Sequence, residues 1–159
     1  QLAQDFAPHS VSTVGEMSLK PNSRNTIPGE VFFTVDIRNP DATVLHDICE
    51  RFLILSQQIA GQYDVEIQVE EIWHNPPVQF NQQCIDAVVS TTAELGYASQ
   101  SIVSGAGHDA CQICRVAPTS MIFVPCRAGL SHNEQEYAEP EDLEAGCNVL
   151  LGAILRLAG

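Results

Sequence analysis

The feature that most restricts the fold of this chain is a strand pattern that runs almost directly into a helix pattern. Residues 30–38, EVFFTVDIR, are rich in β-branched and aromatic side chains, which predicts a strand. The sequence NPD interrupts that pattern. Residues 41–61 then carry apolar side chains at three- and four-residue spacing up to a glycine, which predicts an amphipathic helix.

Two further stretches complete the pattern of the N-terminal half. Residues 11–19 and 65–73 both alternate apolar and polar side chains, as half-buried strands do. The order strand, strand, helix, strand is most of a βαββαβ, or ferredoxin-like, sandwich that lacks its first strand. Residues 1–9 are interpreted as the frayed end of a preceding helix. We therefore expect an α/β chain with a first domain over residues 1–75.

A pair of prolines separates this half from the rest. Pro76-Pro77 stops both helix and strand ladder, so we place a second domain at residues 76–159. Its predicted elements are helices at 84–95, 109–116 and from Pro140 to the end, and short strands at 99–103 and 121–124.

Composition excludes several classes of function. The net charge is −13, from 20 acidic and 7 basic residues. Nucleic-acid affinity depends on Lys and Arg neutralising phosphates, so this charge argues against such binding. No apolar run approaches the ~18–20 residues of a membrane helix, and the N-terminus shows no signal-peptide pattern. A soluble protein that binds no membrane is predicted.

Six cysteines leave more than one interpretation open. Cys111 and Cys114 form a C-x-x-C motif, which occurs in redox and zinc sites. A structural zinc needs a second pair, and the sequence offers none at suitable spacing. Most of the six lie at apolar positions, where cysteine packs as a small hydrophobe. We favour packing in a reducing cytoplasm, with a C-x-x-C redox protein as a competing hypothesis.

The segment from Ser104 to Tyr137 holds the residues best suited to chemistry. Its first part, SGAGHDA, places glycines beside His108, so that the backbone can approach a ligand closely. His132 follows an apolar strand pattern in a polar loop, which suits metal or proton chemistry. From the residues alone, either histidine could equally be a capping or surface residue.

Four motifs in this order resemble one enzyme family. They are TVG at 13–15 with PNSRNTIPG at 21–29, FTVDIR at 33–38, SGAGHDA at 104–110 and SHNEQEY at 131–137. Together they resemble the hydantoinase/carbamoylase branch of the zinc-dependent aminoacylase/carboxypeptidase superfamily. That branch contains N-carbamoyl-L-amino acid hydrolases, beta-ureidopropionases and allantoate amidohydrolases.

The resemblance implies both an architecture and its incompleteness. It makes residues 1–75 a partial ferredoxin-like lid domain that mediates dimerisation. Residues 76–159 become the C-terminal part of an α/β metallohydrolase domain. The upstream metal ligands and the catalytic Glu of such enzymes have no counterpart here. The chain is therefore expected to be the C-terminal portion of a larger enzyme and inactive alone.

The resemblance also implies roles for five residues. His132 would be a metal ligand, with a surface-loop histidine as the alternative. Arg38 would bind the substrate carboxylate as a bidentate fork, unless it pairs with Asp36 or Asp41. Asn25 would hydrogen-bond the substrate, or serve only as a turn residue.

In the glycine-rich segment, Gly107 would lend a backbone group to the substrate, or provide turn geometry alone. His108 would act catalytically near the carbamoyl oxygen, unless it is a buried histidine bonded to Asp109. Arg127 could pair with an anion or with Glu134, and no role is assigned to it.

The implied cofactor is a divalent metal pair, with Zn²⁺ first and Mn²⁺, Co²⁺ or Ni²⁺ as alternatives. Its other ligands would lie outside this chain.

The implied reaction is hydrolysis of a ureido C–N bond, a non-peptide linear amide, in N-carbamoyl amino acids or ureido acids such as allantoate. The partners would be that small substrate and a second copy of the chain, joined through the lid domain. The alternative is a non-catalytic dimerisation or ligand-binding module.

Overall fold

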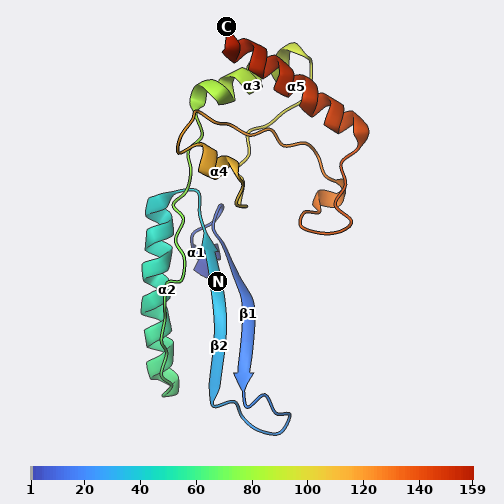
Figure 1. Cartoon of the computed structure of the whole chain (residues 1–159). Coiled ribbons are helices and arrows are strands. Elements are labelled where there is room, and N and C mark those ends of the chain that lie inside the picture. Colours follow the sequence, from blue (N-terminus) through green and yellow to red (C-terminus); the bar gives the residue numbers. More distant parts are fainter. Residues whose placement is uncertain (1) are drawn as a thin grey trace. The chain divides into compact units, whose positions relative to one another are not determined.

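The computed structural model describes residues 2–159, which form two compact units. The first unit ends at Pro77 and the second begins at Val78, close to the boundary expected after residue 75. Figure 1 shows the elements of both units. They are α1 (Leu2–Asp5), β1 (Val11–Lys20), β2 (Glu30–Arg38) and α2 (Ala42–Tyr63), then α3 (Gln82–Glu94), α4 (Ala110–Ile113), the 3₁₀ turn η1 (Arg127–Gly129) and α5 (Pro140–Ala158).

An antiparallel hairpin of β1 and β2 dominates the first unit. Its register runs from Val11 opposite Arg38 to Lys20 opposite Glu30, with an irregularity between Val14 and Met17. The loop 21–29 closes the hairpin, where the Lys20 ammonium lies 2.6 Å from the Glu30 carboxylate. Both strands were predicted, and the structure confirms them.

The expected half-buried character of β1 is wrong. Every residue of this strand is exposed, although its apolar and polar side chains alternate. Alternation buries one face only where another layer packs against it. Within residues 2–159 no such layer covers β1, so Val14 remains 54% and Met17 61% exposed.

The long helix α2 confirms the predicted amphipathic helix. The Asp41 carboxylate caps its start by accepting from the amides of Thr43 and Val44, at 2.8 and 3.1 Å. The helix ends at Asp64, which adopts the left-handed conformation. Its buried face carries Leu45, Ile48, Ser56 and Ala60.

The predicted third strand, residues 65–73, is wrong. This segment belongs to neither a helix nor a strand and lies alongside α2 (Figure 1). The sheet has two strands only, so the segment has no ladder partner among the described residues. Trp73 accordingly stays 74% exposed. The α/β character is present, but the predicted sandwich is reduced to a hairpin and a helix.

Two helices that pack together, α3 and α5, form the core of the second unit. Asn81 caps α3 by accepting from the Cys84 amide at 3.1 Å, and Pro140 occupies the first turn of α5. The buried apolar side chains between them include Ala87, Val149 and Ala153. The predicted helices at 84–95 and from Pro140 are therefore confirmed.

The remaining elements predicted for this unit are reduced or absent. Residues 99–103 and 121–124 form no strand, because no neighbouring strand of the described chain pairs with them. The helix expected at 109–116 is a single turn, Ala110–Ile113, followed by further turns. No helix within residues 2–159 has the length and apolar composition to cross a membrane.

Candidate functional site

The loop that carries His132 has a strained and tightly bonded backbone. We call residues 126–139 the His132 loop. His132 itself has φ of 55°, a left-handed conformation that few non-glycine residues adopt. Its amide donates to the Glu136 carboxylate at 3.0 Å, and its side chain is exposed. The backbone is thus held while the residue faces solvent.

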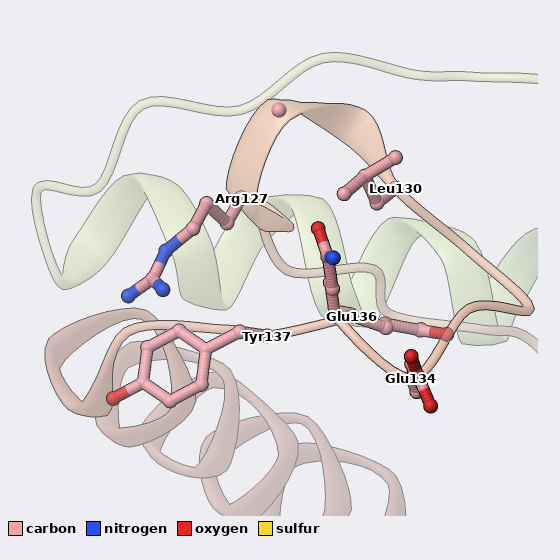
Figure 2. A pocket seen from close by; sticks show the side chains of 7 residues that line it. Arg127, Leu130, Glu134, Glu136 and Tyr137 are labelled. Carbon is pink, nitrogen blue, oxygen red and sulfur yellow. The ribbon is translucent and has the colours of Figure 1, made fainter.

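The base of this loop is closed by Arg127. Its guanidinium donates to the Glu139 carboxylate at 3.0 Å and lies 4.2 Å from the centre of the Tyr137 ring. Arg127 therefore pairs with Glu139 and not with Glu134. Figure 2 shows the Arg127 guanidinium beside the Tyr137 ring. Both residues line an open hollow of about 520 Å³, together with other residues between 127 and 137.

His108 has a different partner from the one expected. Its Nε2 lies 2.9 Å from the Ser104 hydroxyl, and Phe123 meets the imidazole edge-on with ring centres 5.6 Å apart. The imidazole is half-buried. The predicted alternative, a histidine bonded to Asp109, is not what the structure shows. The sequence signal for this contact is Ser104, four residues before His108.

Gly107 lies in an open part of the chain. Its φ is not among the positive values found in this chain, and a Cβ built there would meet nothing within 4 Å. Both predicted roles, a backbone contact to the substrate and turn geometry alone, stay predictions.

Arg38 ends β2 with its guanidinium already engaged. Its Nε and Nη2 donate to the two oxygens of Asp36 at 2.7 and 2.9 Å, a bidentate fork between residues on one face of the strand. Hydrogen bonding to Arg38 holds the pKa of Asp36 below its usual range. The pair is half-exposed, and the predicted alternative of pairing with Asp36 is what the structure shows for Arg38.

Asn25 lies at the opposite end of the hairpin from Arg38. It sits in the loop 21–29, where its side-chain oxygen accepts from the Ser23 hydroxyl at 2.8 Å. The nine-residue strand β2 separates that loop from Arg38 by about 27 Å, at ~3.4 Å per residue. Figure 1 shows the loop that closes the hairpin at one end of β1 and β2. Within one protomer, these two residues cannot reach one carboxylate.

A family model supplies the identification that geometry alone does not. Residues 5–156 match the model of peptidase family M20/M25/M40. The chain belongs to this family. The match runs through all five candidate residues.

Individual relatives narrow the M20 assignment. Over 157 residues the chain is 43% identical to an N-carbamoyl-L-amino-acid amidohydrolase of Rhizobium meliloti, covering 99% of this chain and 38% of the relative. It is 36% identical to an allantoate amidohydrolase of Bacillus subtilis (strain 168), covering 92% and 35%. The predicted resemblance to the carbamoylase branch is thereby confirmed.

The solved structures agree on the fold. A hydantoinase/carbamoylase family amidase from Burkholderia multivorans matches with a TM-score of 0.92 and 50% identity, covering 98% of this chain and 38% of that one. The M20 chain thus spans about 38% of the length of these relatives.

The donor set of this M20 chain fits one ligand of a metal centre and no more. His132 presents an exposed imidazole on a held backbone, which suits a single metal bond. Nowhere in residues 2–159 do three or more His, Cys, Asp or Glu side chains gather so that they could hold a metal ion. Any complete centre needs ligands from beyond these residues.

The cysteines, all within residues 2–159, form no disulfide in the structure. All six are free, and the Cys114 thiol donates to the backbone oxygen of Cys111 at 3.2 Å. Burial, with Glu71 and Glu50 nearby, raises the pKa of the Cys49 thiol, which disfavours its thiolate. These contacts favour the packing interpretation over the redox hypothesis.

Proposed function

We propose that this chain is the C-terminal part of a metal-dependent amidohydrolase that cleaves the ureido C–N bond of N-carbamoyl amino acids or of similar acids such as allantoate. The observation that carries the proposal is similarity over nearly the whole chain to enzymes named for these two reactions. The similar region includes Asn25, Arg38, Gly107, His108 and His132.

Arg38 would bind the carboxylate that these substrates share. Its fork is already oriented by Asp36, so a substrate carboxylate meets a guanidinium in bidentate geometry. A substrate carboxylate would replace Asp36 as the partner of the guanidinium, and the displaced Asp36 would be hydrated by solvent. The half-exposed position of the pair makes this exchange accessible to a small acid.

Asn25 would reach the same substrate from a second protomer. The hairpin length of about 27 Å keeps Asn25 and Arg38 of one chain apart. A homodimer through the first unit would bring Asn25 of one copy to Arg38 of the other. The exposed strands of the hairpin support such pairing, since unpaired edges readily accept another chain.

His132 would bind one ion of a divalent pair, with Zn²⁺ first and Mn²⁺, Co²⁺ or Ni²⁺ as alternatives. When bound, such a pair activates a water molecule and polarises the scissile carbonyl. His108 would contact the carbamoyl oxygen. Ser104 occupies its Nε2, which leaves Nδ1 for the substrate, and the open backbone at Gly107 borders the same segment.

Surface composition supports the role as part of a larger enzyme. Helix α5 exposes large apolar side chains along its length, more than a free surface usually carries, and these include Leu150, Leu151, Ile154, Leu155 and Leu157. With a single metal ligand identified, residues 1–159 alone are expected to be inactive. Six free thiols support a reducing cytoplasm.

The deciding experiment compares two forms of the protein. The complete open reading frame that encodes this chain, and residues 1–159 alone, are each assayed for divalent metal and for hydrolysis of N-carbamoyl amino acids and allantoate. We expect metal and activity in the first form only. A complete protein that dimerises yet binds no divalent metal would support the alternative, a non-catalytic dimerisation or ligand-binding module.

A further inference from the structure

The two ends of the His132 loop are joined by both the backbone and the side chain of Arg127. Its amide donates to the Tyr137 carbonyl at 2.7 Å. Its guanidinium donates to Glu139 at 3.0 Å and stacks on the Tyr137 ring at 4.2 Å. We call Arg127, Tyr137 and Glu139 the clasp.

The loop needs closure because its backbone is strained between the clasp residues. Ala128 and His132 have φ of 53° and 55°, where L-residues lose free energy through contact of Cβ with the backbone. Each such conformation costs on the order of 1–3 kcal/mol and persists only when surrounding contacts enforce it. The contact from Glu136 to the His132 amide enforces one of them locally.

Burial by the described residues does not hold this loop. Residues 131–137 are all exposed. The ion pair is itself half-exposed, with 60% of the Arg127 and 53% of the Glu139 side chain accessible, and such a pair alone contributes little. Besides the short-range hydrogen bonds inside the loop, the ion pair, ring stacking and backbone bond of Arg127 are the contacts that join its two ends.

We propose that Arg127, Tyr137 and Glu139 are positioning residues that preorganise His132 for metal binding. The inference rests on the proposed function, in which His132 is a metal ligand. Residues that orient a ligand from outside the coordination sphere typically change metal affinity 10–100-fold. The clasp acts through the backbone on either side of His132 and touches neither metal nor substrate.

Zinc affinity of the protein expressed from the complete open reading frame tests the clasp. In competition with a chelator, Arg127→Gln and Tyr137→Leu should each bind Zn²⁺ about tenfold more weakly. Tyr137→Phe keeps the ring and should stay within about twofold. Arg156→Gln is the matched control, since it removes the ion pair with Glu94 in the same unit and should leave zinc affinity unchanged.

Amide hydrogen exchange of the metal-free protein gives a second, independent measurement. The Leu130 amide donates to the Arg127 carbonyl at 3.1 Å, and the Glu136 amide donates to the Asn133 carbonyl at 2.9 Å. Both amides should exchange at least several-fold faster in Arg127→Gln. Amides within α3 and α5 should keep their rates, which separates loop opening from general destabilisation.

The possible outcomes distinguish the clasp from the function on which it rests. If Arg127→Gln keeps wild-type zinc affinity and wild-type exchange while His132→Ala loses zinc, the clasp is overturned and the metal site stands. If the wild-type protein binds no zinc, the proposed function fails and the clasp with it. If Arg127→Gln does not fold, the pair Tyr137→Leu and Tyr137→Phe decides by the same criteria.

Discussion

The end of the hairpin and the His132 loop both place an arginine beside a carboxylate, but they fix the backbone by opposite means. Arg38 pairs with Asp36, two residues away on its own strand, at the end of the β ladder where Arg38 lies opposite Val11. Arg127 pairs with Glu139, twelve residues away, across a loop without a ladder.

The difference predicts different consequences of losing each arginine. The ladder of β1 and β2 orders the backbone up to Arg38 through main-chain bonds, so we expect loss of its guanidinium to leave the hairpin in place. The contacts of Arg127 join the two ends of a loop that has no ladder, so we expect their loss to loosen the loop. Two ion pairs of similar geometry therefore predict opposite consequences of mutation.

The largest expected effect is at His132 itself. In the complete protein, His132→Ala should weaken zinc binding by more than the ~100-fold seen for outer-sphere changes, because it deletes a ligand. Zinc content after dialysis measures this. His46→Ala, a histidine of α2, is the control, and an unchanged zinc content in His132→Ala would remove the proposed metal site.

The second effect concerns substrate binding at the hairpin. Arg38→Gln should raise KM for an N-carbamoyl amino acid about 30-fold, since a lost charged pair costs ~2 kcal/mol or more. Zinc content should not change. Arg38→Lys keeps the positive charge, so its KM should lie between those of the wild-type protein and of Arg38→Gln. Loss of zinc in Arg38→Gln would contradict the assignment of separate roles to Arg38 and His132.

The third effect tests the packing of α3 against α5 in the second unit. A Cβ at Gly152 would collide with the Thr91 side chain of α3, so Gly152→Ala should lower the free energy of unfolding by about 1–3 kcal/mol. Gly61 in α2 meets nothing within 4 Å. Gly61→Ala should therefore stabilise by about 0.5–1 kcal/mol. Urea unfolding measures both, and equal shifts would refute the packing argument.

The smallest effect is the titration of Asp36. Its folded-state pKa lies below the ordinary value of 3.8, so its stabilising contribution is present above about pH 4 and is lost as the pH falls through the folded-state pKa. Carboxyl NMR signals followed from pH 6 to 2 measure this pKa. In Arg38→Gln it should return toward 3.8, and an unmoved value would show that Arg38 is not the cause.

Local patterns predicted the elements that need no distant partner. The strands 11–20 and 30–38 pair with each other, and α2 is capped by its own preceding Asp41, so nearby residues suffice. The same holds for α3 and α5. For the candidate site, the sequence supplied the residues and the family resemblance supplied their roles, which stay predictions.

The failures have one physical cause. Residues 65–73 have the alternation of a strand, but a strand exists only when its backbone groups pair with another, and the described chain offers no partner. Exposure of β1 follows from the same lack of a covering layer. Alternation of apolar and polar side chains shows which face of a strand is able to be buried. It does not show whether another strand or layer is present to bury that face.

The sequence by itself determined the family resemblance, the hairpin of β1 and β2, and the helices α2, α3 and α5, and it named the candidate site residues. Only the tertiary structure decided that Arg38 lies on Asp36, that His108 bonds Ser104, that Arg127 closes the His132 loop on Glu139, and that Asn25 and Arg38 stand at opposite ends of a hairpin. Hydrogen bonds and ion pairs act over a few ångströms, so the distances that choose among several nearby partners arise only when the chain is folded.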